Sequence, residues 1–459
     1  MRIGRYYSKS NNSEELAVGR PSFVQRRSVE FAALLVGALA GLMGALFQLG
    51  VGRIALEKEH LANLLAADAL SGWAWAGLLS ALMLILSLWL VRRFAVDAAG
   101  SGIQEIEGFL AGVRPIRWWR VLPVKFFGGL LALGSGMILG REGPSVQMGG
   151  NGGAMVNDML PAGDRNSAHA LVAAGAAAGL AAAFNAPLAG MIFVLEEMRS
   201  FFRYSYLNVR LLVIAVLMST LVVNLIVGEH PALPLPIYHA PVWYEMLLYL
   251  LLGGILGVTG AALNNGILKG LDVMEGLKQK TTYLYLGIAL FGFGIGILHY
   301  LFPEMVSGGY ELVYSSLEGH IAIQSLFFLI LIRFILTIAC FCSGVPGGVF
   351  APIIVLGTII GLWYGEVIES LFPMLTQNPY PFAVAGMGAL FAATVQAPIT
   401  GVVLVVEMTG NYSLIIPIMI ACVGADMVAH KLGALPLYSI LLERLKKSEV
   451  NTTEQSAGL

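Results

Sequence analysis

The sequence predicts an all-α membrane protein with several spanning helices, and its composition and charge pattern support this. Only 12% of the 459 residues are charged and 57% are hydrophobic, and the mean hydropathy is +0.78. A soluble domain carries about a quarter of its residues as charged side chains. This chain therefore cannot cover a water-facing surface, which excludes a soluble enzyme. Five stretches without Asp, Glu, Lys or Arg are long enough to cross a hydrocarbon layer of about 30 Å as helices. They are Phe31–Gly52, Gly72–Val91, Met246–Leu268, Thr281–Pro303 and Phe334–Gly365.

The remaining composition argues against several partners and cofactors. With 27 basic and 28 acidic side chains, the chain is predicted to bind neither nucleic acid nor a polyanion. The cysteines lie inside apolar runs and are too few for a disulfide framework or a metal cluster, so we expect them to be packing residues. We expect no cofactor and no bound metal, and we take the histidines as ordinary loop or interfacial residues. The cysteines are Cys340, Cys342 and Cys422, and the histidines include His169, His299 and His430.

Positive charge marks the cytoplasmic side of a membrane protein. Basic residues cluster before the first apolar run, in Arg199–Arg210, in Lys269–Lys280 and in the tail that holds Arg444. The segments 228–243, 302–320 and 371–381 contain no Lys or Arg. We therefore expect both chain ends to face the cytoplasm.

The chain is expected to consist of two related halves. Four prolines between residues 231 and 241 predict an extended connector, because proline disfavours helix. On either side of it, Gly175–Glu197 aligns with Gly386–Met408, and Ser135–Gly149 aligns with Ser343–Gly357. The alignment pairs prolines and an acid in the same order, so we predict a duplication. The predicted division is 1–28 cytoplasmic tail, 29–228 first membrane repeat, 229–242 connector, 243–442 second membrane repeat and 443–459 cytoplasmic tail.

The repeated segments are rich in glycine and proline, which predicts interrupted helices. Irregular backbone at membrane depth is tolerated where protein buries it or where it lines a polar cavity, and such breaks in two halves point to a transport site. The alternative is that these glycines only permit close helix packing. Helix starts present free N–H groups and a positive dipole end, which together suit a small anion. The three segments concerned are Gly100–Gln104 (GSGIQ), Gly140–Pro144 (GREGP) and Gly347–Pro352 (GGVFAP).

These three segments resemble the GSGIP, GREGP and GxFxP signatures of the CLC chloride channels and transporters. Together with Leu195–Met198 (LEEM), the resemblance runs from about Val29 to Leu442 and is greatest to the bacterial chloride/proton exchangers. It implies an all-α CLC fold of two inverted repeats of tilted, broken helices. It also implies a homodimer with one pore per subunit, embedded in the lipid of a bacterial inner membrane.

The resemblance implies a chloride site on four residues of this sequence. The site would consist of the hydroxyls of Ser101 and Tyr438 and the backbone N–H groups of Val349 and Phe350. All four groups donate hydrogen bonds without carrying a net charge. The alternatives are that Ser101 is a turn or cap residue and that Tyr438 is an interfacial aromatic.

Two acids are candidates for proton coupling. Glu142 resembles the external gating glutamate of the family; its carboxylate would compete with the anion until it is protonated. It could instead be a helix-start carboxylate or a partner of Arg141. Glu197 resembles the inner proton acceptor, or it could pair with Arg199. Its neighbour Glu196 has a twin in the second repeat, which suggests a scaffold role.

The predicted function is proton-coupled chloride antiport, with chloride and protons as the substrates. One departure from the family pattern is Gln104, which stands where proline is usual and leaves anion selectivity less secure. The rivals are a passive anion channel, an intramembrane enzyme that uses Glu142 and Ser101, and a cation-coupled symporter.

Overall fold

The computed structural model describes residues 23–66, 71–160, 164–278, 280–318, 323–376 and 378–457. Within these ranges the regular structure is helical, apart from two isolated bridges. The first half contains α1 (Phe23–Leu65), α2 (Gly72–Phe94), η1 (Val96–Ala98), α3 (Ile103–Leu110), α4 (Trp118–Gly134), α5 (Glu142–Met159), α6 (Arg165–Phe184), α7 (Pro187–Glu196) and α8 (Tyr206–Ile226). The second half contains η2 (Trp243–Glu245), α9 (Met246–Lys278), α10 (Thr281–Leu301), η3 (Pro303–Met305), α11 (Tyr310–Leu317), α12 (Ile323–Cys342), α13 (Phe350–Leu371), α14 (Tyr380–Val395), α15 (Pro398–Thr409), η4 (Tyr412–Leu414), α16 (Ile415–Lys431) and α17 (Leu437–Ala457).

The predicted helical membrane architecture is confirmed. In the described part of the chain, nine helices are long and apolar enough to cross a membrane: α1, α2, α6, α8, α9, α10, α12, α13 and α16. Four of the five uncharged stretches coincide with α1, α2, α9 and α10. The fifth, Phe334–Gly365, is not one helix: α12 ends at Cys342 and α13 begins at Phe350. The glycines between them interrupt the helix, as their density predicts.

The proline-rich connector lacks helix, as predicted. Residues 228–242 contain no helix, and part of this segment contacts the end of α15. The N–H of Leu233 donates to the carbonyl of Met408 at 2.9 Å, and the N–H of Tyr238 donates to the Asn411 side chain, also at 2.9 Å. The connector is therefore attached to the second half as well as joining the two. Residues 1–22 of the predicted N-terminal tail lie outside the described residues, and α17 continues through the boundary expected at residue 442.

The two halves repeat each other in local geometry. Helix α6 ends at Asn185 with φ 50°, and α7 begins two residues later at Pro187. Helix α14 ends at Gln396 with φ 61°, and α15 begins two residues later at Pro398. A third matching pair escaped the sequence comparison, because α3 and α11 share few residue types. Both have eight residues, and each follows a glycine in the left-handed conformation.

Reciprocal contacts show that the second repeat is inverted relative to the first. The carboxylate of Glu196, at the end of α7, accepts hydrogen bonds at 3.0 and 2.6 Å from two N–H groups in the first turn of α15. The carboxylate of Glu407, near the end of α15, accepts bonds at 3.0 and 2.7 Å from two N–H groups in the first turn of α7. Because the end of each helix meets the start of the other, α7 and α15 run antiparallel. Each acid also satisfies free N–H groups at a helix start.

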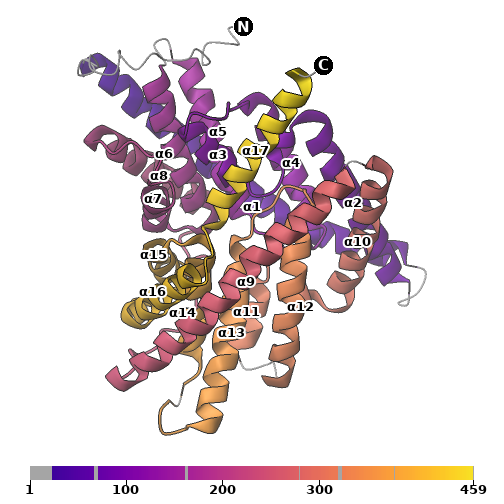
Figure 1. Cartoon of the computed structure of the whole chain (residues 1–459), viewed down its shortest axis with the longest axis vertical. Coiled ribbons are helices and arrows are strands. Elements are labelled where there is room, and N and C mark those ends of the chain that lie inside the picture. Colours follow the sequence, from indigo (N-terminus) through magenta and orange to yellow (C-terminus); the bar gives the residue numbers. More distant parts are fainter. Residues whose placement is uncertain are drawn as a thin grey trace.

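Buried helices surround the broken segments. Helices α5, α6, α13 and α14 are buried over nearly their whole length. The pair α5–α6 meets at Gly149 and Gly175, and the pair α13–α14 meets at Gly357 and Gly386, where a side chain would strike the opposite backbone. The described start of α1 and the last turns of α17 lie toward the same end of the molecule (Figure 1).

Candidate functional site

The three glycine-rich segments are tied together by backbone hydrogen bonds. Gly140 and Gly348 exchange two N–H···O bonds of 2.8 Å each. Gly100 donates to Val345 at 3.1 Å and accepts from Gly347 at 3.0 Å. Segments from both repeats, far apart in sequence, therefore converge on the starts of α3, α5 and α13.

Buried donors without acceptors face this junction. Ser101 and Tyr438 are fully buried, and neither hydroxyl has a hydrogen-bond partner. The Ser101 and Tyr438 side chains lie close to each other. Among the described residues, the N–H groups of Val349 and Phe350 also have no backbone acceptor, because they stand at the start of α13. Buried polar groups are normally paired, so four neutral donors at one place form a candidate anion site.

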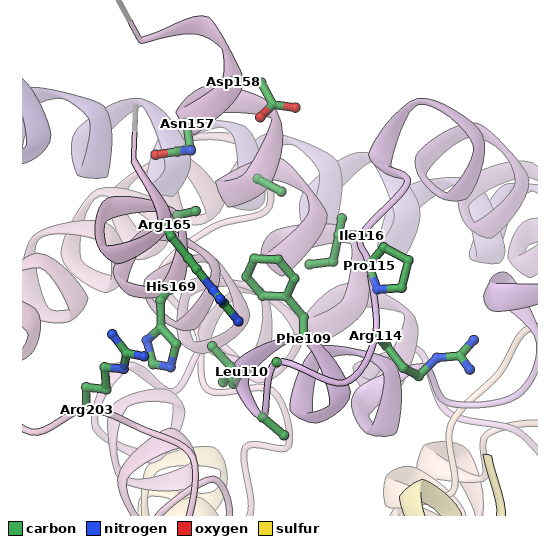
Figure 2. Close-up of a pocket in the computed structure, with 14 residues that line it drawn as sticks. Phe109, Leu110, Arg114, Pro115, Ile116, Asn157, Asp158, Arg165, His169 and Arg203 are labelled. Atoms are coloured by element: carbon green, nitrogen blue, oxygen red, sulfur yellow. The ribbon is translucent and has the colours of Figure 1, made fainter. Parts of the chain in front are cut away.

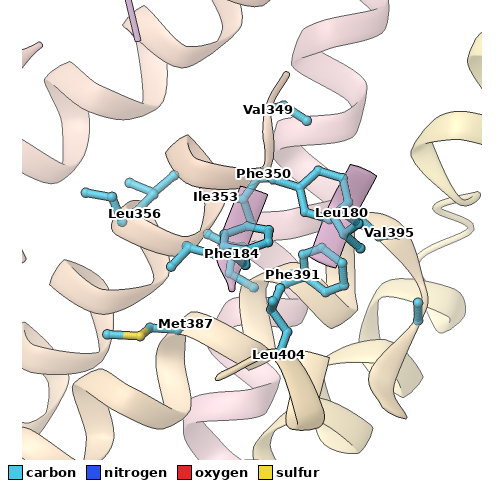
Figure 3. Packing of buried hydrophobic residues seen from close by; sticks show 14 of the residues in the cluster. Leu180, Phe184, Val349, Phe350, Ile353, Leu356, Met387, Phe391, Val395 and Leu404 are labelled. Carbon is cyan, nitrogen blue, oxygen red and sulfur yellow. The ribbon is translucent and has the colours of Figure 1, made fainter. Parts of the chain in front are cut away.

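Aromatic packing holds one wall of the site in place. The Phe350 ring lies 4.9 Å from the ring of Phe391, 5.6 Å from that of Phe193 and 5.9 Å from that of Tyr438 (centroid distances). Phe184 lies slightly farther away, at 6.3 Å. Figure 3 shows Phe184, Phe350 and Phe391 packed together with aliphatic side chains around them. Because these rings come from both repeats, the packing sets the position of the α13 start relative to Tyr438.

Glu142 is fully buried at the start of α5. Its Oε1 accepts a hydrogen bond of 3.0 Å from the Tyr310 hydroxyl. Its Oε2 turns back over Gly140 toward the N–H of Ala351, in the first turn of α13. The carboxylate therefore lies against the same helix start that presents the Val349 and Phe350 amides. The Glu142 side chain thus occupies a position that favours an anion.

A cavity of about 290 Å³ opens beside Glu142 on the side of α11. Its walls include Arg141, Glu304, Tyr310 and Glu311. The Arg141 guanidinium lies 5.8 Å from the centroid of the Tyr310 ring and donates to the carbonyl of Ala183 at 3.2 Å. Arg141 thus has other partners and forms no direct ion pair with Glu142 within the described chain. The pairing considered as an alternative for Glu142 is not present in this structure.

Comparison with known proteins agrees with this geometry. The voltage gated chloride channel family matches residues 81–430. A relative from Vibrio parahaemolyticus, the H+/Cl− exchange transporter ClcA, is 46% identical over 434 residues, which cover 93% of this chain and 92% of the relative. The ClcA of Cronobacter sakazakii is also 46% identical, with the same coverage. The chain belongs to the voltage gated chloride channel (CLC) family.

Solved structures support the same fold. The crystal structure of a slow cyanobacterial Cl−/H+ antiporter superposes with a TM-score of 0.87 at 38% identity, covering 91% of this chain and 98% of that one. A CLC-type fluoride/proton antiporter superposes at 0.73 with 19% identity, which shows the fold alone. The resemblance stated from the motifs is confirmed, and the related proteins are transporters rather than enzymes.

In this CLC protein, a pair of acids lies near Tyr438, and neither acid lines the cavity beside Glu142. Glu197 follows the last residue of α7 and is partly buried, and its Oε1 has no partner. Glu107 on α3 is almost fully buried, and neither of its oxygens has a partner. The two carboxylates are close enough to repel each other, and both act electrostatically on Tyr438. Sequence analysis missed Glu107, although an acid on a short apolar helix was a usable signal.

The fully buried cations Lys125 and Arg333 were also missed. Lys125 Nζ donates to the carbonyls of Ala98 and Gly100 at 3.1 and 2.6 Å, in the loop before α3. Arg333 donates to the carbonyls of Glu304 and Ser307, both at 2.9 Å, in the loop before α11. Each cation satisfies the carbonyls of the loop that precedes a short helix. They stand at matching places in the two repeats, and their dissimilar side chains hid the match.

The structure also shows the surroundings of Gln104, of the cysteines and of two histidines. Gln104 is the second residue of α3, and the loop before it keeps its bonds to Val345 and Gly347 without the usual proline. The three cysteines are buried, as expected of packing residues, and none forms a disulfide within the described chain. The histidine prediction was wrong at two positions. His169 is a buried helix residue, because α6 packs against its neighbours on all sides, and His299 contacts the buried Lys58 at 3.2 Å.

Proposed function

We propose that this CLC protein is a secondary active antiporter that exchanges chloride for protons. The supporting observation is the position of the Glu142 carboxylate at the start of α13, beside the amides of Val349 and Phe350. An ionised carboxylate and a chloride ion would compete for these donors. A proton on Glu142 would remove its charge and release it from the site, so that proton uptake and chloride binding become linked.

Chloride would be held by the hydroxyls of Ser101 and Tyr438 and by the amides of Val349 and Phe350. Neutral donors suit a transported ion, because they bind it without the strong attraction of a buried opposite charge. The related ClcA proteins and the cyanobacterial antiporter, which are described as H+/Cl− exchangers, support chloride as the anion.

Protons would travel between Glu197 and Glu142. Glu197 has an unpaired oxygen and lies near Glu107 and Tyr438. Glu196 is its immediate neighbour, but both of its oxygens are engaged at the start of α15, which leaves it a structural role. The presence of two separate acids favours an exchanger over a passive channel.

Further proposals concern the assembly. We expect a homodimer with one pore in each subunit, in a bacterial inner membrane with both termini cytoplasmic. The membrane part would divide into repeats at 29–228 and 243–442, joined by the connector 229–242. A mass near twice 48.9 kDa for the protein component, measured by light scattering in detergent, would support the dimer.

Flux through reconstituted liposomes tests the antiport. An imposed chloride gradient should drive protons uphill in the wild type. The Glu197→Ala variant should keep chloride flux but lose proton movement, because the inner proton acceptor is gone. The control variant Glu443→Gln, on the exposed face of α17, should behave as wild type. A reversal potential that is independent of pH in the wild type would instead identify a channel.

A further inference from the structure

A second pocket, of about 140 Å³, lies apart from the proposed chloride site. It is bounded by the end of α3, the segment 114–116, the end of α5, the first turns of α6 and the segment after α7. It shares no lining residue with the cavity beside Glu142. The lining residue Arg203 belongs to the basic segment 199–210, which the charge pattern predicts to be cytoplasmic.

Two polar side chains with unpaired atoms form the inner wall of this pocket. Asn157 is 1% exposed; its Oδ1 accepts from Ser167 at 2.9 Å, but its Nδ2 has no partner. His169 is 5% exposed, and its Nε2 is 3.0 Å from the carbonyl of Phe201, which can only accept. Nδ1 of His169 has no hydrogen-bond partner and lies beside the carbonyl of Leu110. The unpaired buried donor here is Asn157 Nδ2, since Nδ1 of a neutral His169 carries no proton when Nε2 donates to Phe201. An unpaired buried donor is unusual, and it indicates a ligand that accepts hydrogen bonds.

Two exposed arginines stand at the mouth. Figure 2 shows Arg165 extending across the pocket and Arg203 on the other side of His169, whereas Arg114 points away. Arg203 donates to Asn166 at 2.7 Å, and neither Arg165 nor Arg203 forms an ion pair with a described carboxylate. By contrast, Arg114 is engaged by acidic partners.

The acidic and apolar residues around the pocket limit the chemical class of ligand that it can bind. The one carboxylate among the described lining residues, Asp158, accepts a hydrogen bond of 2.9 Å from Trp118 and is thereby held. Phe109, Pro115 and Ile116 form an apolar wall opposite the arginines. Guanidinium groups match the geometry of phosphate oxygens, which a spherical ion cannot use in the same way.

We propose that this pocket binds a phosphate-type oxyanion: a phosphate group held by Arg165 and Arg203 at the mouth and by the Asn157 amide inside, with any carbon part against Phe109 and Ile116. Such a group could belong to an anionic phospholipid at the membrane surface or to a free phosphate compound. The two sources share the same chemistry and differ in whether lipid is needed.

Calorimetry with inorganic phosphate on the full-length protein in detergent tests the first source. The double variant R165Q/R203Q should bind phosphate at least about tenfold more weakly than wild type, because two charge-assisted contacts are lost. R120Q is the matched control, since Arg120 is an exposed arginine near the same segment that does not line the pocket. It should bind within about twofold of wild type.

Native mass spectrometry after exchange into phosphatidylglycerol or phosphatidylcholine tests the lipid source. Retention of phosphatidylglycerol by wild type and R120Q, but not by the double variant, would assign the site to a lipid headgroup. Binding of inorganic phosphate without lipid retention would assign it to a free phosphate compound. Equal behaviour of wild type and double variant in both measurements would overturn the proposal, as would displacement of phosphate by an equal concentration of chloride.

The phosphate-binding measurements test the pocket independently of the proposed antiport. Arg165 and Arg203 contact neither acid of the proton route nor the four chloride donors, so chloride-driven proton flux should be the same in all three proteins. Unchanged flux also shows that the variants are folded. Failure of the antiport would leave the phosphate measurements interpretable, because binding does not depend on transport.

Discussion

Glu142 illustrates how much a single residue depends on its surroundings in this CLC protein. It touches groups from three places: the Tyr310 hydroxyl on α11, the backbone at Gly140 and the first turn of α13. A carboxylate in this position carries charge only while it is deprotonated, so its hold on the helix start depends on pH.

Replacing Glu142 by glutamine tests this competition. The amide cannot titrate, so Glu142→Gln should abolish proton coupling and leave a chloride flux that is insensitive to external pH. The control is Glu311→Gln, which neutralises another acid on the wall of the same cavity. Flux in liposomes between pH 4 and pH 8 measures both. Retained proton pumping in Glu142→Gln would contradict the assigned role.

The Tyr310 hydroxyl stabilises the charged form of Glu142, because it can only donate to a carboxylate. A hydrogen bond to a charged group contributes about 1.5–3 kcal/mol, and about 1.4 kcal/mol corresponds to one pH unit. Tyr310→Phe should therefore allow protonation at higher pH and raise the pH of half-maximal chloride flux by about one to two units. Tyr314→Phe, on the same helix, is the control. A shift in the opposite direction would show that the hydroxyl does not act on the ionised acid.

At the scale of the elements, the two helices α7 and α15 hold each other by reciprocal caps. Each receives a glutamate carboxylate from the other at its first turn. Because each carboxylate accepts bonds from two N–H groups, Glu196→Gln and Glu407→Gln should each destabilise the protein by about 1–3 kcal/mol. Glu196 also accepts a bond of 2.7 Å from the Thr400 hydroxyl, so its replacement should cost the larger amount. Thermal melting in detergent measures this loss, with Glu443→Gln as the exposed control. A larger loss for Glu407→Gln than for Glu196→Gln would contradict this ranking of the two caps.

The close contact of α5 and α6 depends on glycine. A Cβ on Gly149 would collide with the carbonyl of Gly175, and overpacking typically costs about 1–3 kcal/mol. Gly149→Ala should therefore lower the melting temperature. Gly254 on α9 has open space where its Cβ would lie, so Gly254→Ala should leave the melting temperature unchanged or raise it slightly. Equal effects of the two substitutions would mean that helix propensity, and not packing, decides.

At the scale of the whole molecule, the proposed site belongs to neither half alone. Ser101 and Glu142 come from the first repeat, whereas the α13 start and Tyr438 come from the second. Backbone bonds and reciprocal caps join the halves in several places, so the covalent connection through the connector should be dispensable.

Cutting the chain within the connector tests whether the two halves associate without a covalent link. Co-expressed fragments 1–231 and 232–459 should copurify and retain chloride flux, because the break lies in the helix-free connector. A cut after Gly260, inside α9, should prevent assembly, since it leaves two short apolar ends in place of one spanning helix. Failure of the first pair to associate would show that the connector holds the halves together.

Sequence alone determined the membrane class, the duplication, the helix breaks and the family, and with them the candidates Ser101, Glu142, Glu197, Val349, Phe350 and Tyr438. The membrane class, the duplication and the helix breaks follow from hydropathy and from the local preferences of glycine and proline. The family and the six candidate residues follow from the resemblance of the glycine-rich motifs. Only the tertiary structure decided that Tyr310 bonds to Glu142, that Glu107 lies near Glu197 and that Glu196 caps the opposite repeat. These contacts join residues up to 204 positions apart, and the physical reason is packing: the inverted repeats bring them together, and no local pattern records which partners will meet.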